Sequence, residues 1–140
     1  MIILADTNIL LDVLAARQPF LPAAQTVWEL SELKQITGVV SAISFNNVYY
    51  IVRKAHGERK ARECLRRARA VFSPIATDER ILDQAMNCPI RDFEDAIQYF
   101  SALHIGADYL VTRNPADFPV RGAIPVVSAE DFVRRWREHS

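Results

Sequence analysis

Short apolar runs typical of buried strands alternate along this chain with longer stretches in which apolar residues recur at helical spacing. We expect strands over residues 2–5, 38–42, 71–76, 108–112 and 124–127, with helices between and after them. Such alternation is typical of a parallel sheet covered by helices on both faces. The sequence therefore predicts an α/β fold, a three-layer α/β/α sandwich with a central parallel sheet.

The predicted helices cover residues 8–17, 22–35, 45–56, 58–70, 78–87, 92–104 and the stretch that follows Ser128. Ser44 and Thr77 are expected to cap helix N-termini, and Gly57 and Gly106 to follow helix C-termini. No linker, repeat or low-complexity segment interrupts this pattern. Because 140 residues are enough to bury a substantial core, we predict a single domain over residues 1–140.

The charge of the chain is balanced, because its 17 basic and 17 acidic side chains cancel. The overall field therefore does not draw the protein to nucleic acid or to a membrane, and any such attraction must be local. Met1 is followed by an apolar run without a basic leader, and that run is far too short for a signal peptide or a membrane span. We expect a cytoplasmic protein with no membrane association.

Polar residues follow three of the predicted strands directly. Asp6 follows the first strand, residues 41–47 follow the second, and residues 112–117 follow the strand DYLV. Ligands of open parallel sheets bind outside the carboxyl ends of the strands, so these three segments are candidates for one site. Asp6 also has a purely structural interpretation, as the cap of the helix that begins beside it.

A second group of acids lies at the start of the helix in DFEDAIQYFSAL. Asp92 and Asp95 are three residues apart and so lie about 60° apart around the helix axis, while Glu94 is expected to point elsewhere. Acids in a first helical turn also interact favourably with the helix dipole, which is the structural alternative for this pair.

Convergence of these acids would imply a bound cation. If Asp6, Asp95 and either Asp92 or Asp117 meet, their mutual repulsion is severe unless a positive ion neutralises them. The candidate ligands are oxygen atoms without nearby His or Cys, which favours Mg²⁺ or Mn²⁺ over Zn²⁺. Such an ion can activate a water molecule and neutralise charge on a phosphate substrate.

Four segments together resemble a known family. The segments DTN, VSAISFNN, DFEDAIQYFSAL and LVTRNPADF, in this order and spacing, resemble the PIN-domain nucleases, in particular the VapC-like toxins of bacterial toxin-antitoxin pairs. The resemblance covers essentially the whole chain. It implies a three-layer α/β/α fold, an acidic pocket that holds Mg²⁺ or Mn²⁺, and hydrolysis of RNA.

The resemblance also assigns roles to individual residues. Asp6 is similar to the first acid of the family and Asp95 to the acid on the later helix. Asn114 falls where many members have a fourth acid and others an asparagine, and Asp117 is close enough to supply a carboxylate instead. Thr112 resembles the small hydroxyl residue that orients the metal-bound acids.

Asn47 is a departure from the family pattern, because it stands where the family usually has a glutamate. An amide still offers a carbonyl oxygen, but it carries no negative charge and cannot act as a base. Asp92, one helical turn before Asp95, is a candidate to compensate. We interpret the chain as a member of a branch that has asparagine at this position.

We therefore predict a metal-dependent endoribonuclease, the toxin of a type II toxin-antitoxin pair, with Mg²⁺ or Mn²⁺ as cofactor. By resemblance its partners are an RNA substrate, a cognate antitoxin and a second copy of the chain in a homodimer. The alternative is a PIN-like RNA-binding or regulatory module with weak or no catalysis. A haloacid-type phosphatase is disfavoured, because that mechanism needs an aspartate where Asn8 stands. The predicted catalytic residues are Asp6, Asp95 and Asp117, and the predicted metal ligands are Asp6, Asp95 and Asp92.

Substrate binding is assigned to Asn47, Thr112, Asn114, Arg62 and Arg66. The two arginines belong to a stripe on one helical face that also includes Arg59 and Arg69. Such a stripe can bind RNA phosphates in a salt-dependent way. A solvated helix face or a contact with the antitoxin explains it equally well.

Overall fold

The computed structural model describes residues 1–119 and 122–139. The described residues form five strands in one all-parallel sheet, with the order β3-β2-β1-β4-β5. Ile3 of β1 pairs with Gly38 of β2 on one side and with Tyr109 of β4 on the other. The strands are β1 (Ile2–Ala5), β2 (Thr37–Ser41), β3 (Ser73–Ile75), β4 (Tyr109–Val111) and β5 (Val126–Val127).

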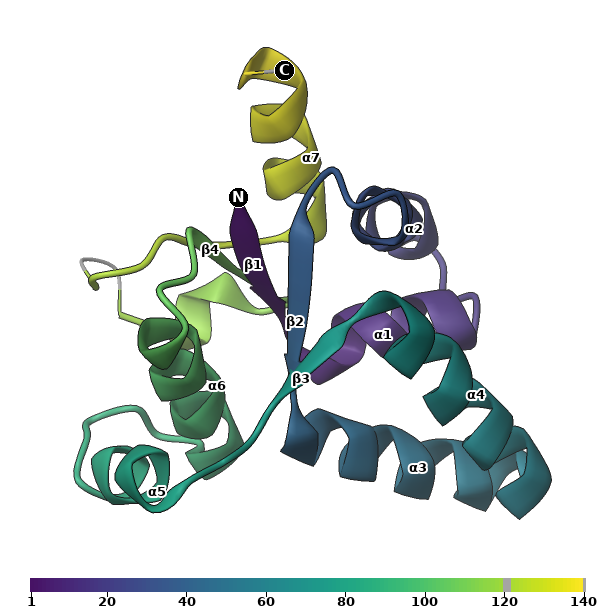
Figure 1. The fold of residues 1–140 in the computed structure, drawn as a ribbon, viewed down its shortest axis with the longest axis horizontal. Coiled ribbons are helices and arrows are strands. Elements are labelled where there is room, and N and C mark those ends of the chain that lie inside the picture. Colours follow the sequence, from purple (N-terminus) through teal and green to yellow (C-terminus); the bar gives the residue numbers. More distant parts are fainter. Residues whose placement is uncertain (120–121, 140) are drawn as a thin grey trace.

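Helices cover both faces of this sheet (Figure 1). The α5–α6 pair lies on one side, and α1 to α4 with α7 lie on the other. The helices are α1 (Thr7–Leu14), α2 (Leu21–Glu32), α3 (Ala42–His56), α4 (Glu58–Val71), α5 (Glu79–Met86), α6 (Phe93–His104) and α7 (Ala129–His139), with a 3₁₀ helix η1 at Pro115–Asp117. The predicted α/β fold with a central parallel sheet is confirmed.

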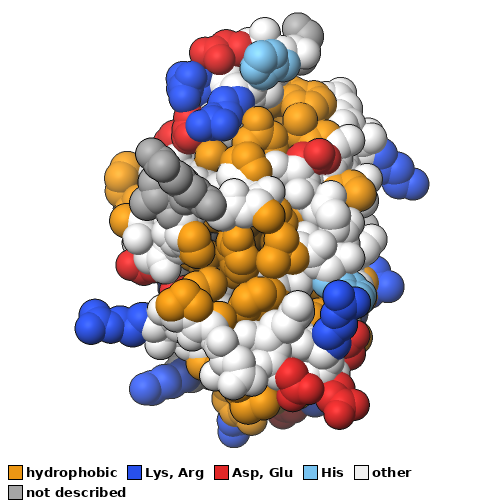
Figure 2. Space-filling model, turned by 90° about the vertical axis from the view of Figure 1, so that its left-hand side faces the viewer, with side chains coloured by type: hydrophobic (Ala, Val, Ile, Leu, Met, Phe, Trp, Pro, Cys, Tyr) orange, Lys and Arg blue, Asp and Glu red, His pale blue; other side chains and the backbone are white. Residues whose placement is uncertain are grey.

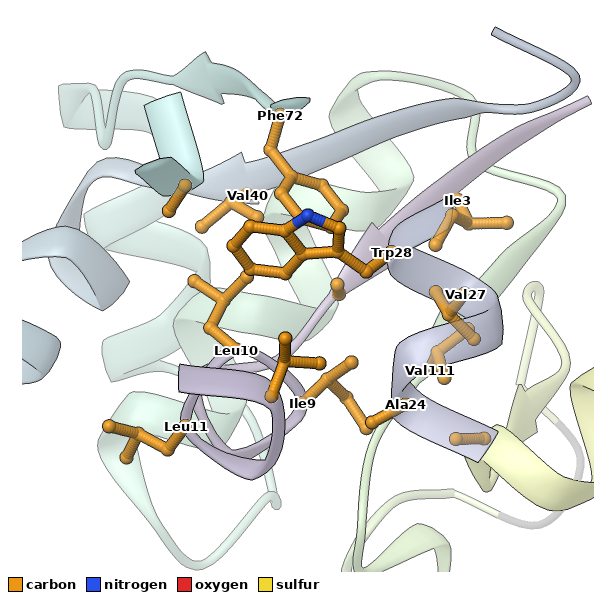
Figure 3. Packing of buried hydrophobic residues seen from close by; sticks show 14 of the residues in the cluster. Ile3, Ile9, Leu10, Leu11, Ala24, Val27, Trp28, Val40, Phe72 and Val111 are labelled. Atoms are coloured by element: carbon orange, nitrogen blue, oxygen red, sulfur yellow. The ribbon is translucent and has the colours of Figure 1, made fainter. Parts of the chain in front are cut away.

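Two hydrophobic cores lie on opposite faces of the sheet because successive strand side chains point to opposite faces. Ile3 and Ala5 belong to the core under α1 to α4 and α7, whereas Leu4 belongs to the core under α5 and α6. In the larger core the rings of Trp28 and Phe72 meet edge to face with centroids 5.3 Å apart (Figure 3). On the α5–α6 side, hydrophobic side chains also gather at the centre of the exposed face, with most charged side chains around it (Figure 2).

Several element boundaries differ from the prediction. Ser41 caps α3, because β2 runs into this helix without a loop. The backbone N–H of Ile43 donates to Oγ of Ser41 over 3.4 Å. The predicted cap Ser44 is instead fully buried inside α3. Asp78 caps α5 in place of the predicted Thr77, and its Oδ1 accepts from Ile81 N over 2.9 Å.

The other element boundaries differ from the prediction by only a few residues. Helix α4 continues to Val71, so β3 begins only at Ser73, and β5 begins at Val126 instead of residue 124. Gly57, at φ +89°, separates α3 from α4 as expected. In the described part of the chain, no helix has both the length and the apolar character needed to cross a membrane.

Candidate functional site

The strand order places a switch point between β1 and β4. The chain first adds β2 and β3 on one side of β1 and then adds β4 on its other side. Helices that leave such a pair of strands diverge, and ligands of open α/β sheets bind in the crevice that results. Asp6 lies at this point, where its backbone N–H donates to the carbonyl of Val111 over 2.9 Å.

A pocket of about 350 Å³ opens at this edge of the sheet. It brings together side chains from the ends of β1 and β4 and from the helices α3 and α6. Among the described residues that line the pocket, three are acidic and none is Lys or Arg. The lining consists of Asp6, Thr7, Asn8, Asn47, Tyr50, Ile51, Glu94, Asp95 and Asn114.

Asp6 is both the cap of α1 and part of the pocket wall. Its Oδ1 accepts a hydrogen bond from Thr7 N over 2.7 Å, and its Oδ2 accepts one from Thr112 Oγ1 over 2.8 Å. Burial raises the pKa of this carboxyl above its ordinary value, and the charges of Glu94 and Asp92 act in the same direction. The hydrogen bonds from Thr112 and Thr7 oppose that rise.

Asp95 lies in the first turn of α6 and faces the same pocket. Its pKa is raised to about 7, chiefly because the carboxyl is partly buried. The next cause is repulsion from neighbouring negative charges, in the order Asp6, Asp92, Asp117 and Glu94. The protein therefore gathers carboxylates here, and none of the described residues supplies a positive side chain to the pocket.

Glu94 also lines the pocket, and the prediction that it points elsewhere was wrong. Its Oε1 lies 3.1 Å from Thr7 Oγ1, and the residue is half-buried. The helical angle between Glu94 and Asp95 is about 100°, but both residues face the pocket because the first turn of α6 sits at its edge. The sequence did hold one signal for the orientation of Glu94. Gln98, one turn later on the same helix face, is a polar side chain within the apolar run AIQYF, which indicates that this face meets other polar groups.

A buried polar chain connects Glu94 to the protein interior. The hydroxyl of Thr7 lies 2.8 Å from Ser44 Oγ, and Gln98 Nε2 donates to the same Ser44 oxygen over 2.8 Å. Ser44 and Gln98 are both fully buried. This chain joins α1, α3 and α6 directly beneath the pocket.

The two other predicted acids lie outside the pocket lining. Asp92 is exposed and caps α6, with its Oδ1 accepting from Asp95 N over 2.9 Å. Asp117 is exposed at the end of η1. Both carboxylates contribute to the raised pKa of Asp95, so their charges reach the site although their side chains do not line it.

The predicted substrate-binding residues fall into two places. Thr112 is buried behind Asp6 and accepts from Asn114 N over 3.3 Å, and the side chains of Asn114 and Asn47 line the pocket. Arg62 is exposed on α4 and pairs with Glu58. Arg66 lines a separate, largely apolar groove between α3, α4 and β3.

A family model described as the PIN domain matches residues 2–116 of this chain. The chain belongs to the PIN-domain family. The match includes all the residues that line the acidic pocket and the loop that carries Asn114. No curated protein sequence matches the chain.

Solved structures share the fold of this PIN domain. VapBC2 from Rickettsia felis, bound to a DNA fragment from its promoter, has a TM-score of 0.72 and 19% identity over 90% of this chain and 97% of that chain. A toxin-antitoxin complex from Klebsiella pneumoniae has a TM-score of 0.66 and 26% identity over 90% of this chain and 96% of that chain. VapC20 from Mycobacterium tuberculosis, a Sarcin-Ricin loop cleaving toxin, has a TM-score of 0.63 and 16% identity over 77% of this chain and 86% of that chain.

The donor set of the PIN domain pocket suits a hard divalent cation. Within residues 1–119 and 122–139, no three or more His, Cys, Asp or Glu side chains are already placed to hold one metal ion. Mg²⁺, however, usually takes only one or two protein carboxylates and keeps several waters. Asp6 and Asp95 can supply those carboxylates, and the amide oxygens of Asn47 and Asn114 are further hard donors in the same pocket.

Proposed function

We propose that this PIN domain is a metal-dependent endoribonuclease of the cytoplasm that hydrolyses RNA phosphodiester bonds. The supporting observation is that Asp6 and Asp95, both with raised pKa values, face one pocket whose described lining residues include no lysine or arginine. Two such carboxylates are more easily ionised when a cation lies between them, so the pocket has a strong electrostatic preference for a positive ion. We propose Mg²⁺ or Mn²⁺ because the donors are all oxygens.

In this proposal Asp6 and Asp95 hold the ion, and Asp92 or Asp117 contributes directly or through water. A bound ion of this kind lowers the pKa of a water ligand and stabilises charge on the phosphate under attack. Thr112 keeps the carboxylate of Asp6 oriented through its 2.8 Å hydrogen bond. Asn47 and Asn114 line the same pocket, and in this proposal their amides, which donate and accept, position the water or a phosphate oxygen.

We further propose that the protein is the toxin of a type II toxin-antitoxin pair. Support comes from the similar solved structures, which include a toxin-antitoxin complex from Klebsiella pneumoniae and VapBC-1 from nontypeable Haemophilus influenzae, the latter with 19% identity and a TM-score of 0.69 over 93% of this chain and 99% of that chain. The expected partners are an antitoxin protein, a second copy of the chain and an RNA substrate.

A second candidate function is an RNA-binding or regulatory module with weak or no catalysis. The observation that favours it is the neutral amide of Asn47 in the pocket, at a place where a carboxylate would add charge for the metal. An amide cannot act as a base, so a nuclease would have to rely on the remaining acids.

The decisive experiment incubates purified protein with a mixed RNA pool in EDTA, in Mg²⁺ and in Mn²⁺. We expect cleavage only with metal, and a loss of about a hundredfold or more in Asp6→Asn and Asp95→Asn, since a metal ion supplies several kcal/mol of transition-state stabilisation. Asp83→Asn, on the exposed face of α5, is the matched control. Equal cleavage by wild type and both site variants, or RNA binding without cleavage by all of them, would rule out the catalytic proposal.

The partner proposal has a separate test. The product of a short open reading frame beside the gene, co-expressed with this chain, is expected to co-purify with it and to suppress RNA cleavage. Light scattering on the isolated chain then measures whether it forms the proposed homodimer. Cleavage that is unaffected by every neighbouring gene product would contradict the toxin proposal while leaving the nuclease proposal intact.

A further inference from the structure

We propose that Glu94 supplies the third carboxylate of the metal pocket, in the place that an acid at position 47 of α3 would otherwise hold. This inference rests on the proposed metal-dependent function and adds a residue to its machinery. In the pocket wall, α3 contributes the amide of Asn47 and α6 contributes the carboxylate of Glu94.

Glu94 lines the pocket, but within residues 1–119 and 122–139 its carboxylate is not yet placed with Asp6 and Asp95 around one ion, so metal binding has to draw it toward them. Glu94 is half-buried in this pocket. Thr7 contacts only its Oε1, and no hydrogen bond to its Oε2 is formed within the described part of the chain. One carboxylate oxygen is therefore held by Thr7, while the other has no hydrogen-bond donor among the described residues.

The buried chain beneath Glu94 fixes its position relative to α3. Thr7 touches both Glu94 Oε1, at 3.1 Å, and Ser44 Oγ, at 2.8 Å. Gln98 Nε2, on the next turn of α6, donates to the same serine oxygen over 2.8 Å. Since Ser44 and Asn47 are one helical turn apart on α3, this chain holds positions 47 and 94 against one pocket from two helices.

The charge of Glu94 acts on the other two acids of the pocket. All three carboxylates line one pocket, and like charges that share a site repel one another. A carboxylate that served only to bind Thr7 could be an amide at no cost, because glutamine offers the same acceptor oxygen. A carboxylate at this place is favourable when a cation binds in the pocket.

The test exchanges amide and carboxylate between the two positions and measures Mn²⁺ binding by calorimetry. Glu94→Gln keeps the acceptor for Thr7 and removes the charge, whereas Asn47→Asp adds a charge with little change in shape. We expect Glu94→Gln to weaken Mn²⁺ affinity by at least about tenfold, as ligand-shell changes do. The double variant Glu94→Gln/Asn47→Asp is expected to recover most of that loss, and Glu79→Gln in the first turn of α5 to bind as wild type does.

The outcomes separate this inference from the function on which it rests. Wild-type Mn²⁺ affinity in Glu94→Gln would overturn the inference, and so would a loss that Asn47→Asp does not repair. RNA cleavage is measured in parallel on the same proteins. Absence of cleavage by wild type, together with normal Mn²⁺ binding and the exchange behaviour described, would overturn the nuclease proposal alone. Thermal unfolding in EDTA confirms that each variant is folded.

Discussion

Thr112 Oγ1 donates a 2.8 Å hydrogen bond to Oδ2 of Asp6 and thereby joins the carboxyl ends of β4 and β1, although the two residues are 106 positions apart in sequence. The other oxygen of Asp6 accepts from Thr7 N over 2.7 Å. Because Asp6 is buried, these two donors replace water and favour its ionised form. Thr112 therefore orients Asp6 and opposes the rise in its pKa, which the proposed role of Asp6 as a cation ligand requires.

Thr112→Val keeps the shape of the side chain and removes this hydroxyl. The carboxylate of Asp6 then loses a donor, so we expect the free energy of unfolding at pH 7 to fall by about 1–3 kcal/mol. We also expect a weaker affinity for Mn²⁺, because the pKa of Asp6 rises further without that hydrogen bond. Urea unfolding and calorimetric titration measure the two effects. Thr37→Val, at an exposed position of β2, is the control, and equal behaviour of the two variants would remove Thr112 from the site.

The stability of the metal-free protein is expected to decrease as pH rises from about 4 to about 7. The pKa of Asp95 is about 7 in the folded state and 3.8 in its ordinary state, so between these values the folded protein holds a proton that the unfolded chain has released. The unfolded state binds fewer protons, and the free energy of unfolding therefore falls with rising pH. Thermal unfolding in EDTA over this range measures the slope.

Asp95→Asn is the control for this pH dependence, since it removes the group with a pKa of about 7 and is expected to reduce the slope, with the remainder due to Asp6. Saturating Mg²⁺ is expected to reduce it as well, because a bound cation stabilises the ionised carboxylate and lowers its pKa. A slope that is the same in wild type and Asp95→Asn would show that this carboxyl does not titrate with a raised pKa.

The sequence was sufficient to predict the sheet and part of the pocket, because both follow from local rules. Strand patterns and the rule that ligands bind at carboxyl ends of strands placed Asp6 and Asn114 near each other. Asp95 was added to them only through the resemblance to the PIN-domain nucleases, because no local rule places the start of its helix at the same edge. All three line one pocket, together with Asn47 from α3.

The remaining parts of the site depend on how helices pack, which the sequence pattern does not specify. A helical wheel gives the angle between Glu94 and Asp95, but the orientation of α6 decides that both face the pocket. Asp92 and Ser44 also show that the sequence pattern alone does not decide the role of a polar residue near the start of a helix. The first caps α6 and the second is buried in α3, and both roles are compatible with the local sequence.

A partly buried ion pair supports the loop that carries Thr112 and Asn114. Arg113 pairs with Asp12 of α1, which is 1% exposed, and its guanidinium lies 4.0 Å from the ring centroid of Phe20. Asp12→Ala leaves the partly buried guanidinium without its partner, so we expect a loss of about 1–3 kcal/mol in the free energy of unfolding. The apolar double variant Asp12→Leu/Arg113→Met is expected to be much less destabilised.

Chemical unfolding of the single and double variants measures this interaction, and RNA cleavage reports whether the loop still holds its place. Glu58→Gln, which breaks an exposed pair with Arg62, is the control and is expected to change stability little. A small loss in Asp12→Ala, comparable to that of Glu58→Gln, would contradict the role of the partly buried pair.

The arginines of α4 make a prediction that can be separated from the acidic pocket. Arg62 is exposed and Arg66 borders an apolar groove, and neither lines the pocket. If they bind RNA phosphates, Arg62→Ala/Arg66→Ala lowers RNA affinity and reduces the slope of log affinity against log salt by about 1.4, since each phosphate neutralised on a single strand accounts for about 0.7. Fluorescence anisotropy with labelled RNA at several salt concentrations measures both quantities, and Lys34→Ala/Arg80→Ala is a control with the same change in charge. An affinity and salt slope equal to those of the control would exclude this face from RNA binding and favour an interface with another protein there.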